Sequence, residues 1–160
     1  MKEEQHLQLQ ICDYLRLQYP KCIFFSEPSG LRVSMGQAKI LKKMRSFGKL
    51  PDMFIAYPND KYHGFFIELK KEGTTIWKQN GEIVADPHIR AQFNTLKTLH
   101  DLGYAAIFGV GFEYTRAKID GYFAMKPMAV EQQKLDFGNA TPSITPIKRT
   151  DPADVKVDKI

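Results

Sequence analysis

The strongest constraint on the fold is a pair of short apolar runs on either side of a turn. The runs are Met53 to Tyr57 and Gly64 to Ile67, and the residues between them, Pro58-Asn59-Asp60-Lys61-Tyr62, are typical of a turn. This pattern predicts an antiparallel hairpin. In such a hairpin, facing residues have numbers that sum to about 120, which places Asp52 opposite Glu68.

Both faces of the predicted hairpin are apolar. Residues alternate between the two faces of a strand, so the face of the two acids also carries Phe54, Ala56 and Phe66. The opposite face carries Met53, Ile55, Phe65, Ile67 and Leu69. A sheet that is apolar on both faces has to be covered on both, and helices are the elements that do so. We therefore predict an α/β fold, an α/β/α sandwich with a mixed central β-sheet.

Asp52, Glu68 and Lys70 are expected on one face of this sheet, since Lys70 lies two residues beyond Glu68. Two facing carboxylates repel each other unless a cation lies between them, and oxygen ligands suit Mg²⁺ or Mn²⁺. A nearby ammonium group can stabilise a developing anion or help ionise an attacking water. The trio favours phosphodiester hydrolysis. The alternative is a surface hairpin whose charged side chains are merely hydrated.

A first helix is expected from Glu4 to Tyr19, before the helix breaker Pro20. Its apolar residues recur at helical spacing and are Leu7, Ile11, Tyr14 and Leu15. Glu4 and Gln8 extend that stripe toward the N-terminus, where the carboxylate of Glu4 can reach a metal. The alternative is an ordinary first-turn glutamate favoured by the helix dipole, and the neighbouring Glu3 competes for the same role.

A second, amphipathic helix is expected from Gly36 to Phe47. The basic residues on and beside it are Arg32, Lys39, Lys42, Lys43, Arg45 and Lys49. They can hold phosphates immediately upstream of Asp52, each contact adding about one unit to the salt dependence of binding. The alternative is a charged face that is only hydrated.

The second half of the sequence supplies further elements. A hairpin around Asn80-Gly81 is predicted first, followed by a helix that Asp86 caps and Pro87 begins. Gln92 lies beside the apolar face of that helix, where it can contact the site or a phosphate, or have no role. A buried strand over residues 104–110 follows, and residues 112–123 read as a short helix with an edge segment.

Composition narrows the class of protein. The chain has 160 residues, 43% of them hydrophobic, which is enough for one domain with a sizeable core. No apolar run approaches the ~20 residues of a membrane span, and the first residues carry no signal sequence, so we expect a soluble, cytoplasmic protein. The net charge of +5 makes an anionic partner plausible. The four histidines and two cysteines show neither zinc nor disulfide spacing.

Residues 126–160 differ from the rest in composition. Prolines punctuate a polar stretch with few large apolar residues, which predicts a flexible tail. Within it, Gln132, Leu135 and Phe137 match the Gln-x-x-Leu-x-Phe pattern by which bacterial and phage replication proteins hold the sliding clamp. The alternative is an apolar tether that packs back on its own domain.

The order and type of these motifs resemble the VRR-NUC family, a branch of the PD-(D/E)xK restriction-endonuclease-like superfamily. The resemblance covers about Glu4 to Tyr122, with the tail outside it. The matching motifs are Glu4-x-x-x-Gln8, Gly48-x-x-Pro51-Asp52, Glu68-Leu69-Lys70 and, in the next helix, Gln92. The resemblance implies a restriction-endonuclease-like nuclease domain over residues 1–125, followed by the tail.

The resemblance also implies roles for individual residues. Asp52, Glu68 and the backbone carbonyl of Leu69 would bind Mg²⁺ or Mn²⁺, and Lys70 would position or activate water. Glu4 would be the helix-borne acid and ligand, and Gln92 the supporting glutamine.

Stand-alone members of this length resemble bacterial and phage proteins, which implies a homodimer that cleaves branched DNA such as four-way junctions or flaps. Two other functions stay open on sequence grounds. One is a non-catalytic DNA-binding module, and the other is a clamp-tethered accessory protein of replication or repair.

Overall fold

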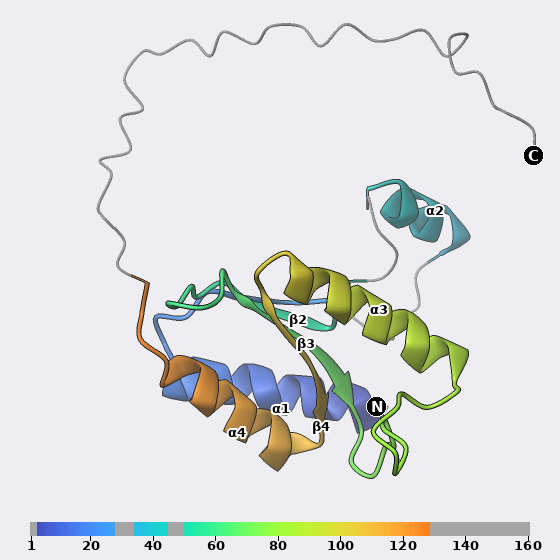
Figure 1. The fold of residues 1–160 in the computed structure, drawn as a ribbon. Coiled ribbons are helices and arrows are strands. Elements are labelled where there is room, and N and C mark those ends of the chain that lie inside the picture. The colour runs from blue at the N-terminus through green and yellow to red at the C-terminus, as the bar shows by residue number, and fades with distance from the viewer. Residues whose placement is uncertain (1–2, 28–33, 45–49, 129–160) are drawn as a thin grey trace, which may run out of the picture. The chain divides into compact units, whose positions relative to one another are not determined.

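The fold is that of a computed structural model, which describes residues 3–27, 34–44 and 50–128. Its elements, in chain order, are α1 (Glu3–Gln18), β1 (Phe24–Ser26), α2 (Met35–Lys43), β2 (Met53–Ile55), β3 (Phe65–Lys70), α3 (Pro87–Asp101), β4 (Ala105–Val110) and α4 (Phe112–Phe123) (Figure 1). The predicted α/β class, with a mixed sheet flanked by helices, is confirmed.

The four strands form one sheet in the order β1-β2-β3-β4. Strand β2 pairs antiparallel with both β1 and β3, whereas β4 runs parallel to β3, so the sheet is mixed. Met53 pairs with Ile67 and Phe54 with Phe66, so the numbers of facing residues sum to 120 as predicted. This register brings the chain just before β2 beside Glu68, near the end of β3.

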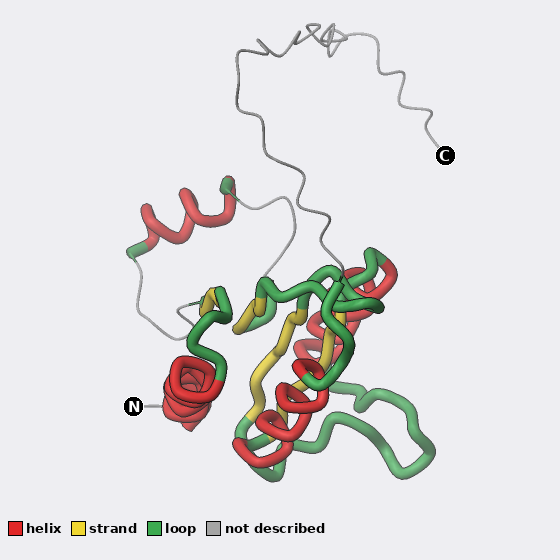
Figure 2. Tube along the Cα trace, turned by 90° about the vertical axis from the view of Figure 1, so that its left-hand side faces the viewer, coloured by secondary structure: helices red, strands yellow, loops and turns green. Residues whose placement is uncertain are grey.

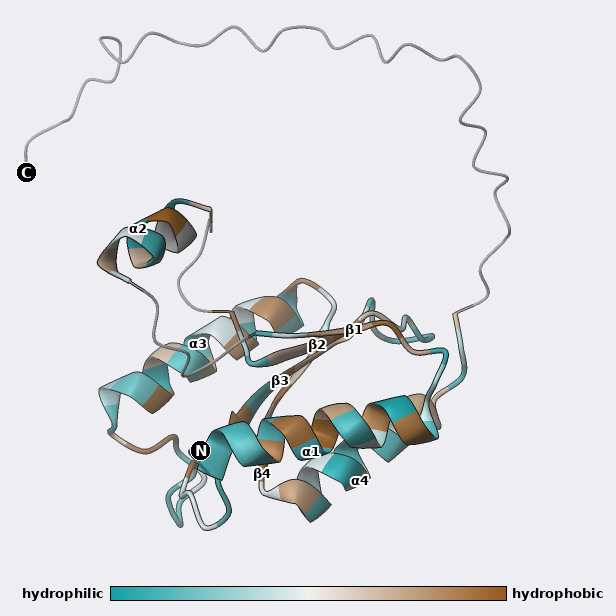
Figure 3. Cartoon of the chain, turned by 180° about the vertical axis from the view of Figure 1, so that it is seen from behind, coloured by the Kyte–Doolittle hydropathy of each residue, from teal (hydrophilic) through white to brown (hydrophobic). Residues whose placement is uncertain are grey.

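The predicted division of the hairpin between two faces is confirmed. One face packs on α1 and α4, and α3 covers the other (Figures 1 and 3). The buried core on the α1 and α4 side contains Leu7, Ile11, Leu15, Met53, Ile55, Phe65, Ile67, Leu69, Ile119 and Tyr122. On the α3 side, the rings of Phe54 and Phe66 stack with their centroids 4.4 Å apart.

Helix α3 begins at the predicted cap. The Asp86 carboxylate accepts hydrogen bonds from the N–H groups of Ile89 and His88, at 3.0 and 2.8 Å, and Pro87 occupies the first turn. These bonds, that from Ile89 above all, lower the pKa of Asp86. The helix ends at Asp101, and Gly103, just beyond the cap residue Leu102, has a φ of 87° that favours glycine. Both ends of α3 are thus determined locally.

Helix α2 begins with a reciprocal cap. The Ser34 N–H donates to Oε1 of Gln37 and the Gln37 N–H donates to Oγ of Ser34, at 2.9 and 3.3 Å. The side chains of Lys39 and Lys43 on this helix are exposed. The other members of the predicted basic group, Arg32, the side chain of Lys42, Arg45 and Lys49, lie outside the described residues.

Two secondary-structure predictions need correction. Residues 112–123 form one continuous helix, because buried Thr115, Ile119 and Tyr122 recur at helical spacing and the polar threonine hides that pattern in the sequence. The predicted hairpin around Asn80-Gly81 is reduced to a single bridge between Trp77 and Ile83. Figure 2 shows it as a long loop between β3 and α3. No helix of the described part could span a membrane.

Tyr122 ties α4 to the end of the hairpin, and we predict that Tyr122→Phe is destabilising. The buried Tyr122 hydroxyl donates to the carbonyl of Tyr57 at 2.6 Å, and burial raises its pKa to about 12. Removal of the hydroxyl should cost about 1–2 kcal/mol at neutral pH, since the carbonyl loses its partner. Urea unfolding monitored by circular dichroism would measure this loss.

The raised pKa also gives the direction of a pH effect. The folded state keeps this phenol neutral, whereas the unfolded state ionises near pH 10, so its contribution is present below about pH 10 and is lost as the pH rises toward 12. Tyr122→Phe should therefore lose less stability between pH 9 and 11.5 than the native chain. The exposed Tyr114→Phe serves as control. An equal alkaline loss in Tyr122→Phe and the native chain would contradict the prediction.

Candidate active site

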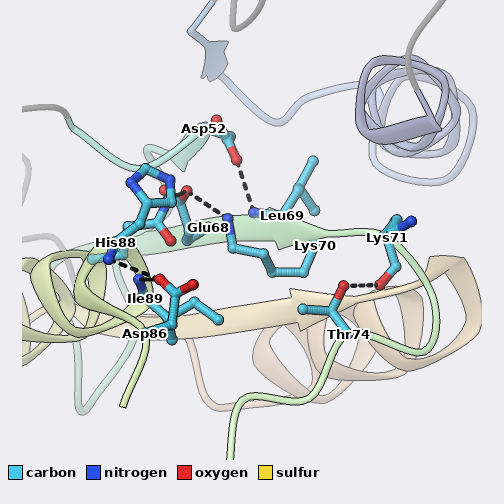
Figure 4. Close-up of polar contacts among 10 residues, drawn as sticks. Asp52, Glu68, Leu69, Lys70, Lys71, Thr74, Asp86, His88 and Ile89 are labelled. Carbon is cyan, nitrogen blue, oxygen red and sulfur yellow. Dashed lines mark hydrogen bonds and ion pairs between the residues drawn. The ribbon is translucent and has the colours of Figure 1, made fainter. Parts of the chain in front are cut away.

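A hollow of about 370 Å³ lies where α1, the start of β2, the end of β3 and the start of α3 meet. Its lining residues are Glu4, Asp52, Glu68, Lys70, Lys71, Thr74, Asp86, His88, Ile89 and Gln92. The five side chains predicted to be catalytic are therefore brought together in one place. Figure 4 shows the polar contacts around the end of β3.

Asp52 is held firmly at the start of β2. Its side chain is 5% exposed, and Oδ2 accepts a hydrogen bond of 2.9 Å from the N–H of Leu69 (Figure 4). Its backbone carbonyl accepts from the N–H of Glu27 at 2.8 Å. The carboxylate is thus anchored on the neighbouring strand β3, because the antiparallel register aligns Asp52 with that strand.

Glu68 and Lys70 form a buried ion pair on β3. They lie two residues apart, so their side chains project from the same face of the strand. Nζ of Lys70 donates to Oε1 of Glu68 at 3.2 Å, and the two residues are only 7% and 3% exposed (Figure 4). Burial of an ion pair costs desolvation energy that its attraction rarely exceeds, so it contributes little to stability. An ion pair that is buried beside a hollow despite this cost indicates a functional role.

Gln92 adds a second donor to Glu68 from α3. Its Nε2 donates to Oε1 of Glu68, and the residue is nine-tenths buried. The other amide atom, Oε1, is buried without a hydrogen-bond partner among the described residues. An unsatisfied buried acceptor costs about 1–3 kcal/mol, and such groups commonly await a ligand or water. Gln92 therefore lines the hollow and contacts Glu68, and its role in the site stays a prediction.

The structure separates the two adjacent acids of α1. Glu4 lines the hollow, whereas the carboxylate of Glu3 lies 3.3 Å from Nζ of Lys71 in an exposed ion pair. Within the described residues, no three His, Cys, Asp or Glu side chains are gathered closely enough to form a metal-ligand cluster. Glu4 thus shares the hollow with Asp52 and Glu68 without completing a three-carboxylate set.

The fold of this chain has a counterpart among solved structures. A protein described as a "VRR_NUC domain protein" matches it with a TM-score of 0.59 and 21% sequence identity, over 79% of this chain and 93% of that chain. This chain shares the fold of that protein. No protein-family model and no curated protein matches the sequence. The predicted resemblance is confirmed as a structural match, and at this identity it is the fold that is shared.

Gln8, on α1, supports the backbone of Asp52 through hydrogen bonds. It is buried on α1, and its Nε2 lies 2.7 Å from Oγ of Ser26, 2.6 Å from the Glu27 carbonyl and 3.3 Å from the Asp52 carbonyl. One side chain therefore links α1 to the end of β1 and to the backbone of Asp52. Gln8 is a positioning residue.

Gln8→Ala is expected to weaken both the fold and the site. Loss of the hydrogen bonds that Gln8 donates should lower the free energy of unfolding by about 1–3 kcal/mol, because the carbonyls that accept them lose this donor. Displacement of Asp52 should also lower the rate of any cleavage. Urea unfolding and a cleavage assay would test both. The exposed Gln10→Ala, on the same helix, is the control, and equal behaviour of the two variants would contradict the prediction.

Five residues of the hollow were not predicted from the sequence as site residues, namely Lys71, Thr74, Asp86, His88 and Ile89. Asp86 was recognised only as a helix cap. A usable signal existed for His88, since it precedes Gln92 by four residues in a helix whose start was predicted correctly. Residues at that spacing share a helix face.

Other predicted binding residues are not brought into this hollow. Lys39 and Lys43 are exposed on α2 and do not line it. Gln132, Leu135 and Phe137 lie outside the described residues. The phosphate-binding and clamp-binding roles therefore stay predictions.

The donors in the hollow fit a hard divalent cation. Asp52 and Glu68 supply two buried carboxylates, and Gln92, which also lines the hollow, has a further oxygen acceptor, Oε1, without a partner among the described residues. Mg²⁺ is usually bound by one or two carboxylates, with waters and substrate phosphates completing its shell. Two protein carboxylates are therefore enough for a Mg²⁺ or Mn²⁺ site of this type.

Proposed function

We propose that this chain is a Mg²⁺- or Mn²⁺-dependent deoxyribonuclease that hydrolyses phosphodiester bonds. The observation that carries the proposal is the buried trio of Asp52, Glu68 and Lys70 at an open hollow. A lysine and two carboxylates are costly to bury and are retained where chemistry needs them. The order of the motifs and the match to a VRR_NUC domain protein favour a nuclease.

In this proposal, Asp52, Glu68 and the carbonyl of Leu69 hold the metal, and Glu4 approaches it from α1. When bound, the metal would supply Lewis-acid stabilisation of the phosphate and lower the pKa of water. Lys70 orients the attacking water and stabilises negative charge that develops in the transition state. Gln92 fixes the carboxylate of Glu68 through its hydrogen bond.

The lining of the hollow favours direct attack by water. Among the described residues it includes no serine, cysteine or tyrosine, and its one hydroxyl, on Thr74, donates to the carbonyl of Lys71 at 2.8 Å. A covalent enzyme intermediate would need an activated nucleophile next to a base. Water held by Lys70 and the acidic residues can itself be the nucleophile, so no covalent enzyme intermediate is needed.

The substrate and partners follow from the resemblance and from charge. We propose branched DNA, such as a four-way junction or a flap, as the substrate of a homodimer acting in the cytoplasm of a bacterial cell or phage-infected host. The basic residues of α2 and of the sequence on either side of it would bind the DNA backbone; they are Arg32, Lys39, Lys42, Lys43, Arg45 and Lys49. Gln132, Leu135 and Phe137 would bind a sliding clamp.

Cleavage of labelled four-way, flap, duplex and single-stranded DNA, with Mg²⁺, Mn²⁺ or EDTA, tests the proposed function. We expect cutting that requires the metal and is fastest on branched DNA. Binding without cutting under every metal would overturn the nuclease proposal in favour of a DNA-binding module. Loss of clamp capture in a pull-down of the Leu135→Ala, Phe137→Ala chain would support the tail's proposed role, and unchanged capture would refute it.

A further inference from the structure

A histidine with no assigned role lines the same hollow as the acids and Lys70. His88 lies in the first turn of α3 and is exposed to solvent. In Figure 4 its ring lies on the side of β3 on which the Glu68 carboxylate and Asp52 lie. A molecule that enters the hollow toward Glu68 can therefore meet the His88 ring.

The position of His88 is determined by its local structure. The Asp86 carboxylate accepts a hydrogen bond of 2.8 Å from the His88 N–H, and Pro87 restricts the backbone of the same turn. One helical turn later comes Gln92, whose amide donates to Glu68. His88 and Gln92 thus share the face of α3 that is turned toward the hollow.

Among the described residues of the hollow, His88 is the one whose side-chain donor has no protein hydrogen-bond partner. Nζ of Lys70 and Nε2 of Gln92 both donate to Glu68. Nζ of Lys71 pairs with Glu3 at 3.3 Å, and the Thr74 hydroxyl donates to a backbone carbonyl. The His88 ring makes no hydrogen bond with any described residue.

A free donor at this place suits an anionic ligand. The hollow carries the carboxylates of Glu4, Asp52, Glu68 and Asp86, which repel a phosphate unless positive charge or donors offset them. We infer that His88 is a substrate-positioning residue whose ring N–H donates to a non-bridging oxygen of a DNA phosphate at or beside the cleaved bond. This inference rests on the proposed nuclease function. It requires no proton transfer by His88.

Replacement of a single DNA phosphate by a neutral methylphosphonate tests the contact directly. A methylphosphonate would be placed at each position in turn around the cleavage site. Binding of each DNA would be measured by fluorescence anisotropy in the Lys70→Met background, which we expect to bind DNA without cleaving it. Cleavage at saturating and at low substrate would be measured in the otherwise native chain. His88→Ala and His88→Gln would be compared with His100→Ala, at the far end of α3.

We expect one methylphosphonate to weaken binding by the Lys70→Met chain about 10- to 100-fold, the range for a lost hydrogen bond to a charged group. His88→Ala should lose that sensitivity at this phosphate alone, while His88→Gln, which keeps a donor, should retain part of it. KM should rise more than kcat falls.

A methylphosphonate profile that is the same with and without His88→Ala, in a chain that cleaves DNA, would overturn the inference and leave the nuclease proposal standing. Failure of the native chain to cleave any DNA would overturn both.

Discussion

Replacement of Lys70 by methionine is expected to abolish DNA cleavage, with a loss on the order of 10³-fold or more. Methionine fills a similar volume but can neither orient water nor stabilise developing negative charge, contributions that each amount to about 10²- to 10⁴-fold. Single-turnover cleavage of the preferred DNA, measured with saturating metal, would give the rate. Binding of the same DNA should persist.

In Lys70→Met, a loss of folding stability has to be distinguished from a loss of catalysis. Glu68 would lose its ion-pair partner 3.2 Å away, and removal of one member of a buried pair costs about 3–5 kcal/mol. Lys70→Arg is therefore a second variant, since it keeps the charge while changing the geometry of the donors. Lys97→Met, at an exposed ion pair on α3, controls for the loss of one positive charge. Native cleavage rates in folded Lys70→Met and Lys70→Arg would refute the assignment.

Asp52→Asn is expected to remove both cleavage and metal binding while preserving the fold. The amide oxygen of asparagine can still accept the 2.9 Å hydrogen bond from the Leu69 N–H, so the local structure should persist. Loss of a charged ligand should lower the cleavage rate by about 10³-fold. It should also remove the stabilisation that Mg²⁺ or Mn²⁺ gives the native chain, about 2.7 kcal/mol at a metal concentration 100 times Kd.

Thermal unfolding with EDTA and with increasing Mn²⁺ would measure this effect without reference to activity. In EDTA the variant should be at least as stable as the native chain, because one of two neighbouring carboxylates is neutral. Asp101→Asn, at an exposed pair with Lys97, removes the same charge far from the hollow. A native Mn²⁺-dependent rise in Tm for Asp52→Asn would show that Asp52 does not hold the metal.

The sequence alone was sufficient for the elements whose signals are local. The hairpin register followed from the turn between two apolar runs, and it aligned Asp52 with Glu68. The start of α3 followed from Asp86 and Pro87, because a cap and a first-turn proline act within a few residues. The apolar character of both hairpin faces was sufficient for the layered α/β class.

Local sequence signals did not predict secondary structure correctly where it depends on tertiary packing. Residues 112–123 were only partly assigned to a helix, since buried Thr115 interrupts the apolar pattern and its burial depends on the rest of the fold. The hairpin around Asn80-Gly81 has the right turn residues. It pairs at a single bridge, because turn chemistry does not supply the cross-strand packing that extends a ladder.

The sequence by itself thus determined the αβ class, the register that aligns Asp52 with Glu68, and the common face of Glu68 and Lys70. Only the tertiary structure decided that Glu4 rather than Glu3 reaches the hollow, that Gln8 supports the backbone of Asp52, and that His88 joins the lining. The physical reason is the distance along the chain over which each kind of interaction acts. Strand alternation, turns and caps act over a few residues, whereas the approach of α1 and α3 to the end of β3 depends on how distant apolar faces pack together.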